Sequence, residues 1–328
     1  MKYRKLGKTG LNISEVSLGT WQVGGGWGGT FDQKVASRII HEAIDQGINF
    51  IDTADVYDAG LSEEAVGNIV RKRKDEVFVA TKCGRQIQPH TADGYTPKAL
   101  RRFVESSLRN LKVDSIDLIQ LHCPPTEVYG RPEIFGLFDD LKKEGKIKNM
   151  GVSVEKVQEA MMALDYENVM TVQIIFNMFR LKPSEEFFPY AVQKNCGIIA
   201  RVPLASGLLA GKIDRNTTFH PEDHRNFNRN GEAFDKGETF SGIDLNKGIA
   251  AVEELKTLFG SRAPLAAIAI RWILMHEEVA TVIPGASNPG QVRANVEAAS
   301  IAPFTEREME EVQGIYDRYF RAEIHAQW

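Results

Sequence analysis

The chain has 328 residues, of which 43% are hydrophobic and 26% are charged, so it is long enough to bury a full hydrophobic core. Its formal net charge of -4 at pH 7 argues against a nucleic acid as the main partner. The three cysteines, Cys83, Cys123 and Cys196, are widely spaced without a CxxC pair, so we expect neither a disulfide framework nor a metal site.

The N-terminal stretch 2–16 predicts a β-hairpin. A GKTG turn at residues 7–10 separates two short segments in which polar and apolar residues alternate. We expect this hairpin to lie across the bottom of the fold. No apolar run follows the basic residues of the stretch, so it predicts neither a signal peptide nor a membrane anchor, and we expect a cytoplasmic protein.

The next feature is the glycine-rich sequence VGGGWGGT. The GxGxxG spacing of dinucleotide-binding loops is matched here by Gly24, Gly26 and Gly29. Asp32, however, stands at the expected start of the following helix, where its carboxylate would cap the N–H groups that a pyrophosphate requires. We therefore expect a substrate loop here, to which Trp21 and Trp27 contribute apolar faces.

Further along the chain, apolar runs of strand length alternate with amphipathic helical segments. The runs lie at residues 16–20, 48–54, 77–82, 116–122, 147–153, 169–177, 197–203 and 280–287. Such a pattern is typical of parallel strands that are buried on both faces. Eight units predict an α/β protein with a single (β/α)8 TIM-barrel domain over residues 1–328, and a doubly wound open sheet is the alternative.

Residues 213–245, after the seventh run, form a long polar stretch rich in Asn, Arg and Gly. The stretch shows no strand or helix periodicity, so we expect an irregular loop. A loop of this length is usually a functional lid or a disordered excursion.

Polar residues lie at or near the ends of three consecutive apolar runs. Asp52 lies near the end of the second run, Lys82 ends the third and His122 the fourth, and Tyr57 follows Asp52 closely. In a parallel barrel these ends meet at one mouth, so the residues would form an acid/base group there. Each residue taken alone would more often be structural, for example in an Asp52–Lys82 ion pair.

The sequence here resembles the aldo-keto reductase superfamily over nearly its whole length. The matching stretches are YRKLGKTGLNISEVSLGT, GINFIDTADVY, SEEAVG, VATK, IDLIQLH, GKIKNMGVS, VQIIFN, PLASGLLAGK and IPGASNPGQVRAN. The resemblance implies NAD(P)H-dependent reduction of an aldehyde or ketone by a catalytic tetrad of Asp52, Tyr57, Lys82 and His122. Tyr57 would give the proton, and the Lys82 charge would lower the pKa of the phenol.

The resemblance also implies a nicotinamide cofactor held without a Rossmann fold. The implied cofactor-binding residues are Gly19, Thr20, Trp21, Asp52, Ser153, Gln173, Arg201, Pro203, Leu204, Ser206, Leu208, Lys212, Gly285, Ser287, Gln291 and Asn295. NADP(H) is favoured, with NAD(H) as the alternative. Gln291 stands where some members have arginine, and Arg293 is the only cation near it, so a strict preference for NADP(H) is not expected.

Two positions depart from the family pattern. Val154 replaces an asparagine that usually helps to hold the nicotinamide, and Arg201 stands where many members place an aromatic residue. We expect Arg201 to lie beside the nicotinamide, and a structural salt bridge is nearly as well supported.

The expected substrate is a small-molecule carbonyl or alcohol, and a sugar or small polar carbonyl is favoured. The residues expected to bind it are Trp21, Trp27, Tyr57 and His122. The alternative function is a nucleotide-sensing binding subunit of the same fold, similar to relatives that attach to ion channels. Turnover of any aldehyde would separate the two hypotheses.

Overall fold

The computed structural model describes residues 1–25, 29–260 and 262–328. At its centre lies an eight-stranded parallel sheet whose strands follow one another in chain order. The strands are β3 (Leu18–Gly19), β4 (Phe50–Asp52), β5 (Phe78–Cys83), β6 (Ile116–His122), β7 (Ile147–Ser153), β8 (Val169–Ile175), β9 (Gly197–Arg201) and β10 (Val279–Val282). Each predicted apolar run therefore contains or overlaps one strand.

The sheet closes on itself between its first and last strands. Val16 forms a parallel bridge with Val282, and Gly19 forms one with Gly285. The backbone N–H of Ser17 donates to the carbonyl oxygen of Val282 at 2.9 Å. Closure in chain order confirms the predicted (β/α)8 barrel, and the alternative of a doubly wound open sheet is wrong.

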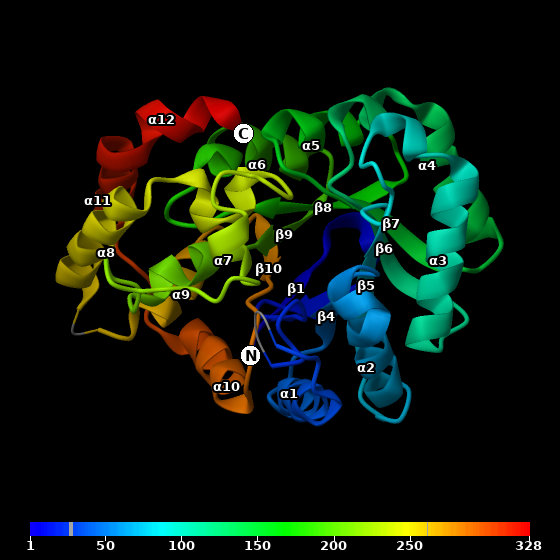
Figure 1. The fold of residues 1–328 in the computed structure, drawn as a ribbon, viewed down its shortest axis with the longest axis horizontal. Coiled ribbons are helices and arrows are strands. Elements are labelled where there is room, and N and C mark those ends of the chain that lie inside the picture. The colour runs from blue at the N-terminus through cyan, green and yellow to red at the C-terminus, as the bar shows by residue number, and fades with distance from the viewer. Residues whose placement is uncertain (26–28, 261) are drawn as a thin grey trace.

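Helices surround the strands (Figure 1). They are α1 (Gln33–Asp45), α2 (Leu61–Val70), α3 (Pro97–Leu111), α4 (Pro132–Lys143), α5 (Val157–Ala163), α6 (Phe188–Gln193), α7 (His224–Phe227), α8 (Leu245–Phe259), α9 (Leu265–Leu274), α10 (Pro289–Glu297), α11 (Glu306–Tyr316) and α12 (Ala322–Ile324). None of the described helices combines the length and the apolar character needed to span a membrane.

Helix α3 illustrates why these segments are helical. Leu100, Phe103, Val104 and Leu111 recur at helical spacing, and all four are buried against the sheet. Pro97 occupies the first turn, where its missing N–H costs nothing, and the Oγ1 atom of Thr96 accepts a hydrogen bond from a backbone N–H of that turn.

The hairpin lies at the bottom of the barrel, as predicted. Strand β1 (Tyr3–Lys5) pairs antiparallel with β2 (Asn12–Ser14). Leu6 and Ile13 are fully buried and pack against Phe50 and Leu118, which lie near the starts of β4 and β6. Burial of such a side chain contributes about 1.5–3 kcal/mol, so the hairpin closes the lower end of the barrel core.

The stretch 213–245 is more ordered than its sequence predicts. It contains α7 and two 3-10 turns, Lys236–Glu238 and Phe240–Gly242, and the side chains of Glu238 and Phe240 are buried. The Asp223 side chain accepts a hydrogen bond from a backbone N–H of α7. Local capping of this kind orders parts of a chain without hydrophobic periodicity, and the rest of the stretch is the long loop after the seventh strand that the sequence predicts.

Candidate active site

The four tetrad residues come together at the mouth of the barrel. The Nζ atom of Lys82 lies 2.5 Å from Oδ1 of Asp52 and 3.2 Å from the hydroxyl oxygen of Tyr57. The rings of Tyr57 and His122 meet edge to face, with centroids 6.1 Å apart. Lys82 also donates to the backbone oxygen of Thr53 at 2.9 Å, so its ammonium is held from three sides.

Local backbone geometry positions the phenol. After β4 the chain makes a tight turn, Tyr57–Gly60, in which Asp58 and Ala59 have φ values of 48° and 53°. The ring of Tyr57 lies 4.9 Å from the Lys82 ammonium. On another side, the ring of Trp21 stacks on Tyr57 with centroids 6.1 Å apart. Trp21 therefore covers the proposed proton donor.

Two buried amides complete the surroundings of Asp52. Its Oδ2 atom accepts hydrogen bonds from Nε2 of Gln120 at 3.1 Å and from Nε2 of Gln173 at 2.8 Å. Sequence reasoning assigned Gln173 to the nicotinamide and overlooked Gln120, which lies two residues before His122 and so shares its face of β6. Both oxygens of Asp52 are therefore engaged, Oδ1 by the Lys82 ammonium and Oδ2 by the two amides.

Burial dominates the protonation of these groups. Burial alone would lower the pKa of Lys82, but the negative charge of Asp52 and the contact with Tyr57 raise it, so the ammonium stays charged. Burial also raises the pKa of Tyr57, and Lys82 offsets this only in part. Lys82 therefore lowers this pKa as expected, but burial raises it by more, so the pKa of Tyr57 stays above its usual value. At neutral pH the phenol carries the proton that a donor needs.

His122 is kept neutral. Burial, followed by the charges of Arg85, Lys82 and Arg201, lowers the pKa of His122 well below its usual range. The Nε2 atom of the ring lies 3.4 Å from Nη1 of Arg85. Arg85 comes three residues after Lys82 and was not singled out from the sequence, although it follows the end of the same strand.

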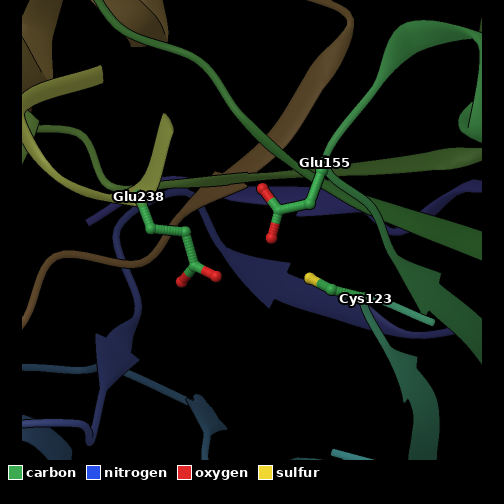
Figure 2. A group of neighbouring side chains, drawn as sticks. All are labelled: Cys123, Glu155 and Glu238. Carbon is green, nitrogen blue, oxygen red and sulfur yellow. The ribbon is translucent and has the colours of Figure 1, made fainter. Parts of the chain in front are cut away.

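A cluster of charged side chains lies next to His122. We call Arg85, Arg201, Glu155 and Glu238 the mouth cluster. Arg85 pairs with Glu238 at 2.6 Å, and Arg201 pairs with Glu155 at 2.9 Å and with Glu238 at 3.4 Å. Figure 2 shows that the two carboxylates and the thiol of Cys123 point toward a common centre from different segments of the chain.

The oxygen and sulfur atoms of Cys123, Glu155 and Glu238 lie within 4.8 Å of one another, a spacing that could suit a metal ion. Burial, however, raises the pKa of the Cys123 thiol, and a metal ligand must be a thiolate. Burial also raises the pKa of Glu155 to about 7, whereas Arg85 and Arg201 hold that of Glu238 at about 2 against burial. The arginines already supply the positive charge, so we interpret the group as an ion-pair cluster.

The structure places Arg201 at the mouth and in ion pairs. Its Nη2 atom also donates to the backbone oxygen of Val154 at 3.0 Å, and its side chain is buried. Both features match the salt-bridge alternative stated above. Ser153 lies at the end of β7 with its Oγ atom 3.5 Å from the sulfur of Cys123.

The other predicted cofactor residues lie after β9 and β10 and around the closure of the barrel. Ser206 is in the left-handed region with φ 55°, Leu208 is fully buried, and Leu204 and Pro203 precede them. Lys212 is exposed. This segment could therefore contact a cofactor through backbone groups, one hydroxyl and one cation. The side chain of Leu208 could not take part, because it is fully buried.

The segment after β10 leads into helix α10. Gly285 is exposed, and Asn295 of the helix donates to its carbonyl oxygen at 3.2 Å. The N–H and hydroxyl of Ser287 donate to Oε1 of Gln291 at 2.7 and 3.1 Å. An exposed glycine shortly before the start of a helix fits the anionic part of a dinucleotide.

The residues around the closure are held by the barrel itself. The N–H of Gly19 donates to the carbonyl oxygen of Pro284 at 3.1 Å, and Thr20 Oγ1 donates to the backbone oxygen of Asp52 at 3.0 Å. These bonds fix the start of the loop that carries Trp21.

Part of the glycine-rich sequence, with the helix start that follows it, lies within the described residues. Asp32 caps α1 as predicted, because its Oδ1 atom accepts from the N–H groups of Lys34 and Val35 at 2.7 and 3.1 Å. The N-terminus of α1 is thus already capped by a carboxylate. Gly26 and Trp27 lie outside the described residues, so the predicted role of Trp27 in substrate binding stays a prediction.

Comparisons with known proteins agree with this geometry. A model of the Aldo/keto reductase family matches residues 15–317. The solved structure of the glycerol dehydrogenase AKR11B4 from Gluconobacter oxydans is 30% identical, has a TM-score of 0.77, and is matched over 98% of its length and 100% of this chain.

Two curated relatives with different functions also match most of the chain. The NADH-specific methylglyoxal reductase of Escherichia coli (strain K12) is 30% identical over 92% of this chain and 94% of its own length. A probable voltage-gated potassium channel subunit beta of Arabidopsis thaliana is 29% identical over 92% of each chain. On the family match and the arrangement of its barrel mouth, the chain belongs to the aldo/keto reductase family.

Proposed function

We propose that the protein reduces a small polar aldehyde or ketone to the alcohol with NADH or NADPH. The observation that carries this proposal is the connected set Asp52, Lys82 and Tyr57, in which a protonated phenol lies beside a buried ammonium at the barrel mouth. Family membership supports a nicotinamide-dependent oxidoreductase. The roles of the individual residues are inferred from their geometry.

The reaction needs a hydride at carbon and a proton at oxygen. The bound nicotinamide cofactor supplies the hydride. Tyr57 gives its hydroxyl proton to the carbonyl oxygen, so that the C=O double bond becomes a C–O single bond with a new C–H and a new O–H bond. Lys82 stabilises the phenolate that forms, and Asp52 keeps the ammonium in place.

The polarity of the mouth favours a small, polar substrate. The mouth cluster places two guanidinium groups and two carboxylates next to His122, and these groups can bind hydroxyl or carbonyl oxygens better than a long apolar chain. Two relatives that match over almost their whole length are a glycerol dehydrogenase and a methylglyoxal reductase, whose substrates are small and oxygen-rich. We therefore propose a small hydroxylated or dicarbonyl compound, or a sugar.

The test is a panel of aldehydes, ketones and aldoses, each assayed with NADH and with NADPH by the loss of reduced cofactor. Tyr57→Phe keeps the ring and removes the donor, so its turnover should fall by about 10²- to 10⁴-fold with unchanged cofactor affinity by fluorescence quenching. Tyr3→Phe, which deletes a hydrogen bond to the Gly47 carbonyl far from the mouth, is the matched control.

Two results would contradict this proposal. If cofactor binds but no member of the panel turns over, the chain is better described as a nucleotide-sensing binding subunit, as the relation to a potassium channel subunit allows. Near-normal turnover of Tyr57→Phe, with chemistry shown to limit the rate, would remove Tyr57 from the role of proton donor.

A further inference from the structure

Arg85 lies directly beside His122, two residues after the end of β5. Its Nη1 atom is 3.4 Å from Nε2 of His122. The side chain of Arg85 is 20% exposed, whereas His122 is 4% exposed. The guanidinium of Arg85 is therefore more accessible to a small molecule in the mouth than the imidazole of His122 is.

The guanidinium is held in place by three neighbours. Nη2 of Arg85 donates to Oε1 of Glu238 at 2.6 Å, and Glu155 lies 3.8 Å away. The ring of Phe234 lies 5.5 Å from the guanidinium carbon. A positioned cation of this kind loses little freedom when it binds a ligand, which is the requirement for stabilising charge in a transition state.

The hydrogen-bonding roles of the two side chains follow from their chemistry. A guanidinium has only donors, so Nε2 of His122 must be the acceptor of this contact, and the ring proton must be on Nδ1. A second ring proton is disfavoured, because Lys82, Arg85 and Arg201 all surround the imidazole with positive charge. Nδ1 has no hydrogen-bond partner in the described part of the chain, so the contact at Nε2 alone decides the tautomer.

We propose that Arg85 is a further catalytic residue, which donates a hydrogen bond to the carbonyl oxygen that Tyr57 protonates, while Nε2 of His122 accepts from Arg85 and positions it. The inference rests on the proposed carbonyl reduction. The hydride still forms the C–H bond and the Tyr57 proton the O–H bond. Arg85 keeps all its protons and stabilises the negative charge that develops on the oxygen.

The tautomer can be measured on the protein without turnover. Nitrogen-15 NMR of histidine-labelled protein separates the two ring tautomers, and His122→Gln identifies the His122 signals. We expect His122 in the wild type to be neutral with its proton on Nδ1. We expect Arg85→Met to shift the ring nitrogens, because the donor to Nε2 is lost. A wild-type ring protonated on Nε2 would overturn the inference.

Kinetics test the contact with the substrate. Loss of one positioned donor to a developing oxyanion should lower kcat by about 10²- to 10³-fold in Arg85→Met, with unchanged cofactor affinity. Added guanidine should restore part of the turnover of Arg85→Ala. Arg262→Met is the matched control, because Arg262 also pairs with one glutamate, Glu308, and contacts one phenylalanine ring, Phe304, but lies away from the mouth.

The outcomes separate this inference from the proposed function. If the wild type turns over the panel and Arg85→Met keeps kcat within about threefold, Arg85 is not catalytic although the proposed function stands. Rescue by guanidine supports a contact with the substrate, and its absence in a folded Arg85→Ala variant contradicts one. If the wild type reduces no substrate, the proposed function fails, and with it the catalytic contact of Arg85; the NMR result then decides only the pairing with His122.

Discussion

The protonation of Tyr57 is decided by a competition between burial and the Lys82 charge. Burial favours the neutral phenol and prevails, so the pKa of Tyr57 lies above its ordinary value. For carbonyl reduction this is the useful state, because the group must give a proton. For alcohol oxidation the phenolate must form first, so oxidation should speed up as the pH approaches the raised pKa.

Asp55 is a buried acid that the mechanism does not use, and it gives a prediction about stability. Its carboxylate is 2% exposed, and neither oxygen makes a hydrogen bond of ordinary geometry with the residues that the structure describes. Burial and the charge of Glu63 raise the pKa of Asp55 from 3.8 to about 8. Between these pH values the folded protein holds a proton that the unfolded chain has released.

The free energy of unfolding should therefore fall as the pH rises through this window, by up to about 1.4 kcal/mol per pH unit from this group. Asp55→Asn cannot ionise, so its stability in urea should fall less steeply between about pH 5 and about pH 8. Asp165→Asn, at an exposed position, is the control. Equal slopes for the wild type and Asp55→Asn would show that Asp55 ionises normally.

Whether a site residue can be predicted from the sequence depends on which part of the chain positions it. The tetrad residues Asp52, Lys82 and His122 could be predicted, since each lies at or near the end of an apolar run and parallel strands end at the same mouth. The partners of Arg85 could not, because Glu238 belongs to the stretch 213–245, whose path follows from local capping and tertiary packing. The sequence shows that Arg85 is charged, but it does not show that Arg85 pairs with Glu238.

At the scale of elements, the C-terminal residue holds the segment that carries Glu238. The Nε1 atom of Trp328 donates to Oδ1 of Asp235 at 2.8 Å, and its ring lies 4.2 Å from the guanidinium carbon of Arg180. Gly237 packs so closely that an added Cβ atom would come within 2.9 Å of the Trp328 ring. Trp328 thus fixes the turn Lys236–Glu238 against the mouth.

Removal of Trp328 should disturb the substrate site more than the cofactor site. We expect Trp328→Ala to lower kcat/KM for the carbonyl by about tenfold or more, because a hydrogen bond to a charged group is worth about 1.5–3 kcal/mol and Glu238 loses its support. Cofactor affinity should change little. Trp328→Phe keeps most of the packing, so it shows whether the loss of activity comes from unfolding. Gln327→Ala, at the exposed neighbouring position, is the control. An equal loss of cofactor affinity would place this segment over the cofactor.

In the molecule as a whole, closure of the barrel brings its first and last strands, β3 and β10, side by side. Helix α1 lies between α10 and α2 in the outer ring (Figure 1), so residues far apart in the sequence become neighbours. The closure itself could be predicted from eight strand and helix units. The side-chain pairs across the closure could not be predicted, because the sequence does not show how one helix is rotated relative to its neighbour.

One such pair affects the cofactor. Arg293 of α10, the only cation that the sequence places near the proposed adenosine site, pairs with Glu42 of α1 at 3.0 Å. A 2′-phosphate of NADPH would have to compete with Glu42 for this guanidinium. The pair therefore weakens the case for NADP(H) that the family resemblance makes.

Release of Arg293 should shift the cofactor preference toward NADPH. An exposed salt bridge is worth about 0–1 kcal/mol, so Glu42→Gln should raise the ratio of kcat/KM for NADPH to that for NADH by no more than about fivefold. Gln291→Arg adds a new cation at the start of α10 and should raise the ratio further, and this gain should shrink at high salt. Glu297→Gln, exposed near the end of the same helix, should leave the ratio unchanged. If neither Glu42→Gln nor Gln291→Arg moves the ratio, the adenosine ribose does not bind at the start of α10, and the predicted contacts of Gly285, Ser287 and Gln291 must be given up.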